Sequence, residues 1–210
     1  MIVLGVDPGS RITGYGLIEK TGSDIVCLGS GHISSPGNTP FYHRIHHIFL
    51  SMVDIMRQFK PEEMAVEEVF YAKNVKSSLK LGHARGAVMI AAVHCGVKIF
   101  EYSPLEIKKA VVGYGRATKK QVRAMIKMIL RLTYEPGLDT SDALAAAICH
   151  ANWTRFLSGR SSLMTNTKAQ MSNLRMSFPC LPAYDLWRAG RNEKSEKMSE
   201  KTQAWLNYWQ

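Results

Sequence analysis

The sequence predicts an α/β protein in which a mixed five-stranded sheet is flanked by helices on both faces. Short apolar runs of strand length occur five times, and longer segments with apolar residues every three or four positions lie between and after them. Three predicted strands come first, a helix and a strand then alternate twice, and three helices end the series. This order favours helices packed on a sheet.

The first three predicted strands form an antiparallel meander. Residues 2–7, with the sequence IVLGVD, are apolar on both faces, as expected of a central strand that is covered on both sides. Short turns at Pro-Gly-Ser and Gly-Ser-Asp separate this strand from predicted strands at 14–20 and 25–34. Strands joined by such short turns pair with their neighbours.

The remaining elements are five helices and two strands. Phe41, Ile45, Ile48 and Met52 recur at helical spacing and begin one apolar stripe, and Pro61 ends that helix. The other predicted elements are strands at 63–69 and 97–102 and helices at about 75–94, 104–112, 118–132 and 140–156.

The composition changes after Gly159. Residues 161–183 are rich in Ser, Asn and Thr, which is typical of a linker. Near the end, five residues share one helical face, which indicates either a short amphipathic helix or a frayed tail. They are Met198, Thr202, Trp205, Leu206 and Trp209. We therefore divide the chain into a domain at 1–157 and a C-terminal extension at 158–210.

The chain of 210 residues is basic, with a formal net charge of +10. The excess is uneven, because residues 73–131 hold thirteen Lys or Arg against only Glu101 and Glu106. A basic block of this kind indicates a partner with a phosphate backbone, although a solvated face of mixed helices is the alternative. The four cysteines form no CxxC pair, and no apolar run approaches the roughly 18 residues of a membrane span. We expect a cytoplasmic protein with reduced thiols.

Four acidic residues stand where the predicted elements would present them to one pocket. Asp7 ends the first strand, where α/β sheets commonly bind ligands. Glu67 ends the fourth strand, although the pattern alone does not choose between it and Glu68. Asp139 and Asp142 lie one turn apart at the start of the last helix, where acidic caps are also common.

Small residues surround these acids. The face that carries both aspartates continues through Ala143 and Ala146, so we expect this helix to press on the sheet and direct the acids inward. Glycines also cluster near the first strand, and we expect the space beside them to admit the backbone of a ligand. They are Gly5, Gly9, Gly14 and Gly16.

Converging carboxylates require a cation or a proton. Two negative charges about 4 Å apart repel by about 4 kcal/mol at an effective dielectric constant of about 20. Hard oxygen ligands suit Mg²⁺ or Mn²⁺. Two such ions can clamp the attacking and leaving oxygens of a phosphodiester, so the four acids in a basic chain predict a metal-dependent nuclease.

Four ordered segments resemble the RuvC family of crossover junction endodeoxyribonucleases. They are IVLGVDPGSRITGYGLI, MAVEEVFYAKNVKSSLKLGHARG, EYSPLEIKKAVVGYGRATKKQV and DTSDALAAAICH. The resemblance implies an RNase H-like fold and a homodimer with two Mg²⁺ per subunit. It also implies paired symmetric nicks that resolve Holliday junctions in recombination and DNA repair, leaving 5′-phosphate and 3′-hydroxyl ends. A RuvA–RuvB branch-migration complex is the implied partner. The resemblance ends at about residue 157.

The resemblance also assigns roles to residues. The family pattern AxExVF selects Glu67 as a metal ligand, together with Asp7, Asp139 and Asp142. Lys119, in the ATKKQV segment, resembles a catalytic lysine near the scissile phosphate. The predicted DNA-binding residues are Phe70, which resembles an aromatic that engages bases, and Lys73, Lys76, Lys80, Arg85, Lys108, Lys119 and Lys120.

Two other functions remain open on the sequence. An ATPase or kinase of the actin-like fold would use a similar turn to hold phosphate, but it normally carries a second such loop, and none is visible. A non-catalytic junction-binding module is the other alternative. Gly82 and Gly86 would let two helices approach closely, either across a dimer interface or within the monomer.

Overall fold

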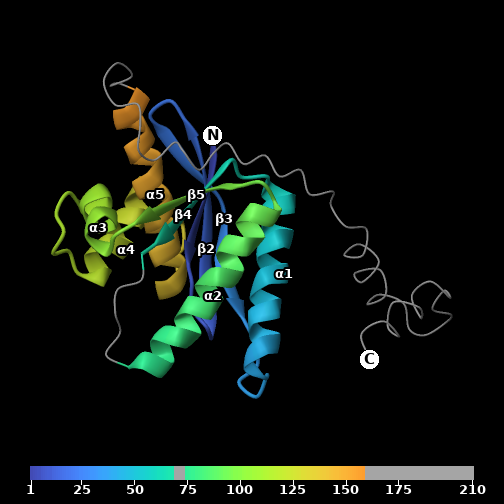
Figure 1. Cartoon of the computed structure of the whole chain (residues 1–210). Coiled ribbons are helices and arrows are strands. Elements are labelled where there is room, and N and C mark those ends of the chain that lie inside the picture. The colour runs from blue at the N-terminus through green and yellow to red at the C-terminus, as the bar shows by residue number, and fades with distance from the viewer. Residues whose placement is uncertain (69–73, 159–210) are drawn as a thin grey trace. The chain divides into compact units, whose positions relative to one another are not determined.

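The computed structural model describes residues 1–68 and 74–158, and within these ranges five strands and five helices follow one another in the predicted order (Figure 1). The predicted linker and amphipathic helix of the C-terminal extension lie outside the described residues. None of the helices in the described ranges is long and apolar enough to cross a membrane.

The five strands form one mixed sheet in the order β3-β2-β1-β4-β5. Strand β1 pairs with β2, and β2 with β3, in antiparallel fashion, whereas β1–β4 and β4–β5 are parallel. The predicted meander and the central place of the first strand are therefore confirmed. The strands are β1 (Ile2–Asp7), β2 (Ile12–Thr21), β3 (Asp24–Ser34), β4 (Glu63–Glu67) and β5 (Lys98–Tyr102).

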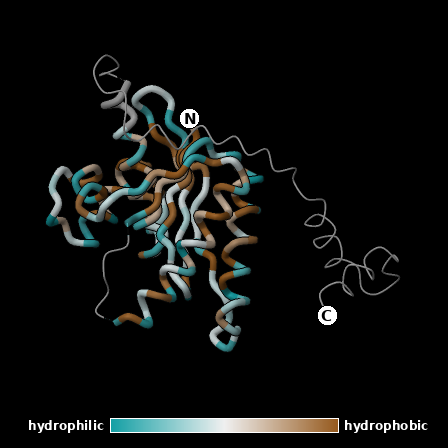
Figure 2. Tube along the Cα trace, in the orientation of Figure 1, coloured by the Kyte–Doolittle hydropathy of each residue, from teal (hydrophilic) through white to brown (hydrophobic). Residues whose placement is uncertain are grey.

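Helices cover both faces of the sheet, as predicted (Figure 1). One face carries α1 and α2, and the other carries α3, α4 and α5. Figure 2 shows α1 alternating between hydrophobic and hydrophilic segments along its length, as expected of a helix with one face on a sheet. The helices are α1 (Phe41–Phe59), α2 (Val75–His94), α3 (Pro104–Val112), α4 (Lys119–Ile129) and α5 (Leu138–Ser158).

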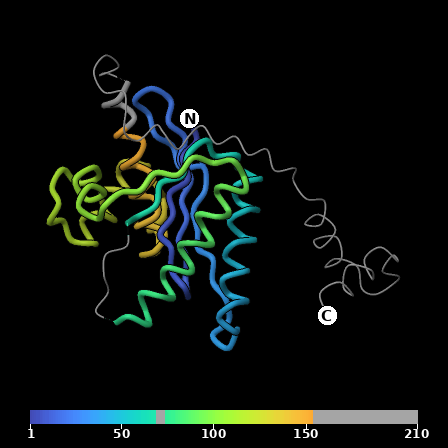
Figure 3. Tube along the Cα trace, viewed as in Figure 1, coloured from blue at the N-terminus to red at the C-terminus, as the bar shows by residue number. Residues whose placement is uncertain are grey.

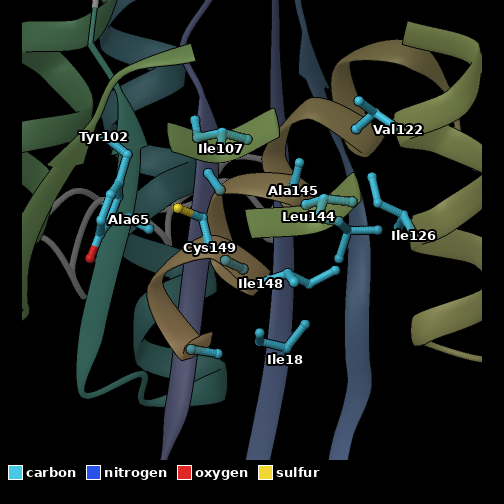
Figure 4. Packing of buried hydrophobic residues seen from close by; sticks show 14 of the residues in the cluster. Ile18, Ala65, Tyr102, Ile107, Val122, Ile126, Leu144, Ala145, Ile148 and Cys149 are labelled. Atoms are coloured by element: carbon cyan, nitrogen blue, oxygen red, sulfur yellow. The ribbon is translucent and has the colours of Figure 1, made fainter. Parts of the chain in front are cut away.

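Helix α5 is the centre of the core on its face of the sheet. Leu144 and Ile148 of α5 are fully buried beside Ile18 of β2 and Ile126 of α4 (Figure 4). Burying such a side chain contributes about 1.5–3 kcal/mol, so these contacts hold α5 firmly on the sheet. Figure 3 shows that the first strands and α5 lie side by side, although they come from opposite ends of the described chain.

The ends of several elements differ from the prediction by a few residues. Helix α4 ends at Ile129 rather than at 132, because Arg131 adopts a left-handed conformation with φ 50°. A capping box between Thr118 and Gln121 sets its start. Strand β4 ends at Glu67, and α5 begins at Leu138, so both aspartates lie in its first two turns.

Three of the glycines near β1, namely Gly5, Gly14 and Gly16, make room for α5, and the expectation that a ligand would approach them is wrong. A Cβ added at Gly5 would lie 2.0 Å from the carbonyl oxygen of Ala143, and one at Gly14 would lie 2.1 Å from that of Asp139. At Gly16 the nearest atom is Cδ2 of Leu144, and at Gly9 it is a backbone oxygen of the same turn. The expectation that small residues of α5 press on the sheet is confirmed.

Helices α1 and α2 leave an apolar groove between them. Exposed apolar side chains contribute to it, and added Cβ atoms at Gly82 and Gly86 of α2 would meet nothing within 4 Å. The glycines therefore do not serve close packing within the monomer, which removes one of the two alternatives for them. Lining residues include Tyr42, Ile45, Phe49, Leu79, Gly82 and Ile90.

Candidate active site

Asp7 is held at the end of β1 by a turn with its own hydrogen bonds. The hydroxyl group of the buried Thr13 donates to the carbonyl oxygen of Gly9 at 2.8 Å and accepts from the Gly9 N–H at 3.3 Å. Side chains alternate along a strand, and the face of Gly5 meets α5. The half-buried Asp7 side chain therefore lies on the α5 face of the sheet.

Glu67 ends β4 beside Asp7. The parallel register pairs Gly5 with Ala65, and Ala65 is buried in the cluster around α5. Alternation then places Glu67 on the α5 face too, where its side chain is half-buried, whereas Glu68 is exposed.

The first turns of α5 bring two further carboxylates to this edge of the sheet. The backbone of Asp139 rests against Gly14 of β2, which pairs with Asp7 in the sheet. Asp142 accepts a hydrogen bond from Nζ of Lys119 at 2.7 Å, and its side chain is 23% exposed. Lys119 begins α4, so its position depends on the capping box that starts that helix.

The four acids lie close enough for their charges to influence the pKa of Asp7. Burial, together with the charges of Asp142, Glu67 and Asp139, raises the pKa of Asp7 to about 7, and Lys119 opposes this rise. Burial and the charge of Asp142 also raise the pKa of Glu67, with Lys119 opposing the rise. The hydrogen bond to Asp142 raises the pKa of Lys119, so its ammonium group stays charged.

The four carboxylates fit a hard divalent cation in donor type and in charge. Burial and the mutual repulsion of the acids raise the Asp7 pKa to about 7, and a cation would relieve the repulsion. Carboxylate oxygens are the ligands that Mg²⁺ and Mn²⁺ prefer. Within residues 1–68 and 74–158, however, no three His, Cys, Asp or Glu side chains are already gathered at ion-holding spacing. In this structure the positive charge beside Asp142 is the ammonium group of Lys119.

The model of the family described as crossover junction endodeoxyribonuclease RuvC matches residues 3–150. The chain belongs to the RuvC family. Geobacter metallireducens RuvC is 49% identical over 152 residues, which are 72% of this chain and 93% of the relative. Shewanella frigidimarina RuvC is 52% identical over 150 residues, 71% of this chain and 86% of the relative.

A solved structure of a RuvC protein is also similar. The structure of T. thermophilus RuvC in complex with Holliday junction substrate has a TM-score of 0.71 and 34% sequence identity, and the match covers 74% of this chain and 96% of that one. The yeast mitochondrial Holliday junction resolvase Ydc2, at 12% identity and a TM-score of 0.53, shares the fold. The predicted RNase H-like fold is thus confirmed.

The predicted DNA-binding residues lie in different surroundings. Lys108 lies near the acids, because its charge opposes the rise in the pKa of Glu67, while Lys120 and Lys76 are exposed on α4 and α2. Lys80 lies 6.0 Å from the centre of the Phe41 ring. The described residues do not include Phe70 and Lys73. DNA contact by these residues remains a prediction for this RuvC chain.

Arg85 is a predicted DNA-binding residue whose guanidinium group is largely buried and engaged inside the protein. It donates to the backbone carbonyl oxygen of Glu67 and to the carboxylate of Glu101. Sequence reasoning missed the Arg85 contact, since nothing in a linear pattern pairs a residue of a helix with residues of two strands. It also missed the local bonds between Thr13 and Gly9. The only signal for Thr13 is a polar residue at the start of an otherwise largely apolar strand.

Proposed function

We propose that this chain is a structure-selective endonuclease that resolves Holliday junctions in recombination and DNA repair. The observation that carries the proposal is the gathering of Asp7, Glu67, Asp139 and Asp142 beside Lys119 in a member of the RuvC family. A RuvC protein with 34% identity was solved with Holliday junction substrate, which supports the same substrate class here.

The proposed reaction is hydrolysis of a phosphodiester bond, leaving a 5′-phosphate and a 3′-hydroxyl end. Two Mg²⁺ ions per subunit, or Mn²⁺ in their place, supply Lewis-acid activation when bound. Asp7 and Glu67 would hold them from the sheet, and Asp139 and Asp142 from α5. Lys119, whose side chain is 68% exposed, can turn from Asp142 to a phosphate and stabilise the charge that develops there.

Paired nicks in opposing strands require two active sites, and a homodimer supplies them. The groove between α1 and α2 is our proposed interface, because its exposed apolar side chains and open glycines suit a second copy of the same helices. A dimer of this kind would place two basic surfaces on one junction. We also propose action in the cytoplasm, with a RuvA–RuvB branch-migration complex as partner.

The experiment that tests the proposal is nick mapping on a synthetic mobile four-way junction. We expect the chain to cut opposing strands at symmetric positions when Mg²⁺ is added, and to leave ends that ligase seals. Asp7→Asn should abolish cutting and keep junction binding, since it removes a carboxylate from the site and not from the basic surface.

Each alternative function has its own signature in this experiment. Junction binding without any metal-dependent nicking would indicate a non-catalytic binding module. ATP turnover without nicking would indicate an ATPase or kinase of the actin-like fold. Loss of junction binding in Asp7→Asn would contradict the separation between the metal site and the DNA surface.

A further inference from the structure

Arg85 lies on α2, across the sheet from the helix that carries the aspartates. Its side chain is 13% exposed, compared with 68% for Lys119. The guanidinium group forms an ion pair with Glu101 of β5 and donates to the carbonyl oxygen of Glu67. Its charge is thus already paired, which leaves it poorly placed to neutralise a DNA phosphate.

The bond to Glu67 is made where the strand ends. Strands β4 and β5 are parallel, with Val66 opposite Glu101 and Glu67 opposite Tyr102. The next residue, Glu68, donates its backbone N–H to the carbonyl oxygen of Tyr102 at 2.8 Å. Arg85 therefore adds a second link between the end of β4 and β5. Its planar guanidinium group donates to an acceptor on each strand at once.

The side chain and the backbone of Glu67 make contacts on opposite faces of the sheet. Its carboxylate lies on the α5 face among Asp142, Lys119 and Lys108, while its carbonyl oxygen is held by Arg85 from α2. Side chains that bind a metal are oriented by contacts of this kind with residues that do not touch the metal. An arginine that fixes the backbone fixes the start of the side chain without adding its charge to the acidic site.

We infer that Arg85 is a positioning residue that, with Glu101, sets the orientation of Glu67 for divalent-cation binding, and is not a DNA contact. This inference rests on the proposed function, because it assigns a metal-holding role to Glu67. It also revises the sequence-based prediction that Arg85 belongs to the DNA surface.

The test measures metal binding and junction binding separately. Mn²⁺ binding to the full chain is followed by electron paramagnetic resonance of the free ion, and junction affinity is measured by fluorescence anisotropy without divalent metal. Arg85→Gln is expected to weaken Mn²⁺ binding about tenfold, and to raise the Mg²⁺ concentration for half-maximal nicking to a similar degree. Nicking should recover toward the native rate at saturating Mg²⁺, with junction affinity unchanged.

Further variants separate positioning from general damage. Glu101→Ala should weaken Mn²⁺ binding in the same direction, and adding it to Arg85→Gln should produce little extra loss, since the two residues act as one unit. Arg85→Lys should retain only part of the native Mn²⁺ binding, because an ammonium group lacks the planar pair of donors that a guanidinium group has. Lys98→Gln, which removes a positive charge at the other end of β5, is the matched control and should keep native Mn²⁺ binding.

Several outcomes would overturn the inference. Lower junction affinity with a native metal requirement in Arg85→Gln would make Arg85 a DNA contact, as would tighter junction binding in Glu101→Ala. If Arg85→Gln fails to fold, Arg85→Lys and Glu101→Ala decide the question. Asp7→Asn separates the two proposals: native Mn²⁺ binding in that variant removes the proposed metal site, whereas loss there with native binding in the Arg85 and Glu101 variants removes only the positioning role.

Discussion

Gly14→Ala should disable the site although it changes no functional group. Gly14 pairs with Asp7 across the β1–β2 ladder and faces the backbone of Asp139 at the start of α5. It is therefore the point at which the sheet and the helix bring two of the carboxylates together. A methyl group there must separate β2 from the first turn of α5.

The size of the separation follows from the contacts. The added Cβ would lie 2.1 Å from the carbonyl oxygen of Asp139 and 2.4 Å from its carbon, whereas ordinary contact begins at 3.4 Å. The backbone of Asp139 must therefore retreat by about 1 Å, and a misplacement of that size can cost about a hundredfold in rate. Overpacking at such a position typically costs about 1–3 kcal/mol of stability, so the variant should still fold.

The assay is metal-dependent nicking of a four-way junction, with thermal unfolding measured alongside. Gly37→Ala is the matched control, because its added Cβ meets nothing within 4 Å, and it should behave as the native chain. A folded Gly14→Ala variant that nicks at the native rate with the native metal requirement would refute the claim that the approach of α5 to β2 positions the site.

Three further predictions concern charge. The pKa of about 7 at Asp7 means that the folded metal-free protein keeps a proton that the unfolded chain releases above 3.8, so stability falls as the pH rises through this window. Asp7→Asn removes this loss and should melt higher than the native chain at neutral pH without metal; equal melting temperatures there would contradict the raised pKa. Lys119→Gln should lower nicking by about 10²–10³-fold, checked by single-turnover kinetics, and a native rate would exclude it from catalysis. With roughly six phosphate contacts, junction affinity should fall about a thousandfold between about 50 and 200 mM salt, and a flat titration would remove the electrostatic basis of binding.

The fold was predictable because its elements differ in local pattern. The apolar run of β1 indicates a central strand, and the stripe that begins at Phe41 indicates α1; both elements occur as expected. The places where elements end were less predictable. The left-handed Arg131, for example, depends on how α4 meets the following segment, and periodicity carries no information about it.

The site was predictable in part. Asp7, Asp139 and Asp142 stand out from their neighbours at strand and helix ends, but the choice of Glu67 over Glu68 came from resemblance alone. The glycine cluster predicts space for a ligand, whereas α5 takes that space at Gly5, Gly14 and Gly16, because a sequence does not say which backbone will approach. The Arg85 contact joins residues that are far apart along the chain, so only the folded structure reveals it.

The most direct test of the shared metal site is a crystal of the chain soaked with Mn²⁺, with its anomalous scattering measured. We expect anomalous peaks between the carboxylates of Asp7, Glu67, Asp139 and Asp142, with Lys119 moved away from Asp142. Peaks only elsewhere on the protein, or none among these four side chains at saturating Mn²⁺, would contradict a cation site built from them.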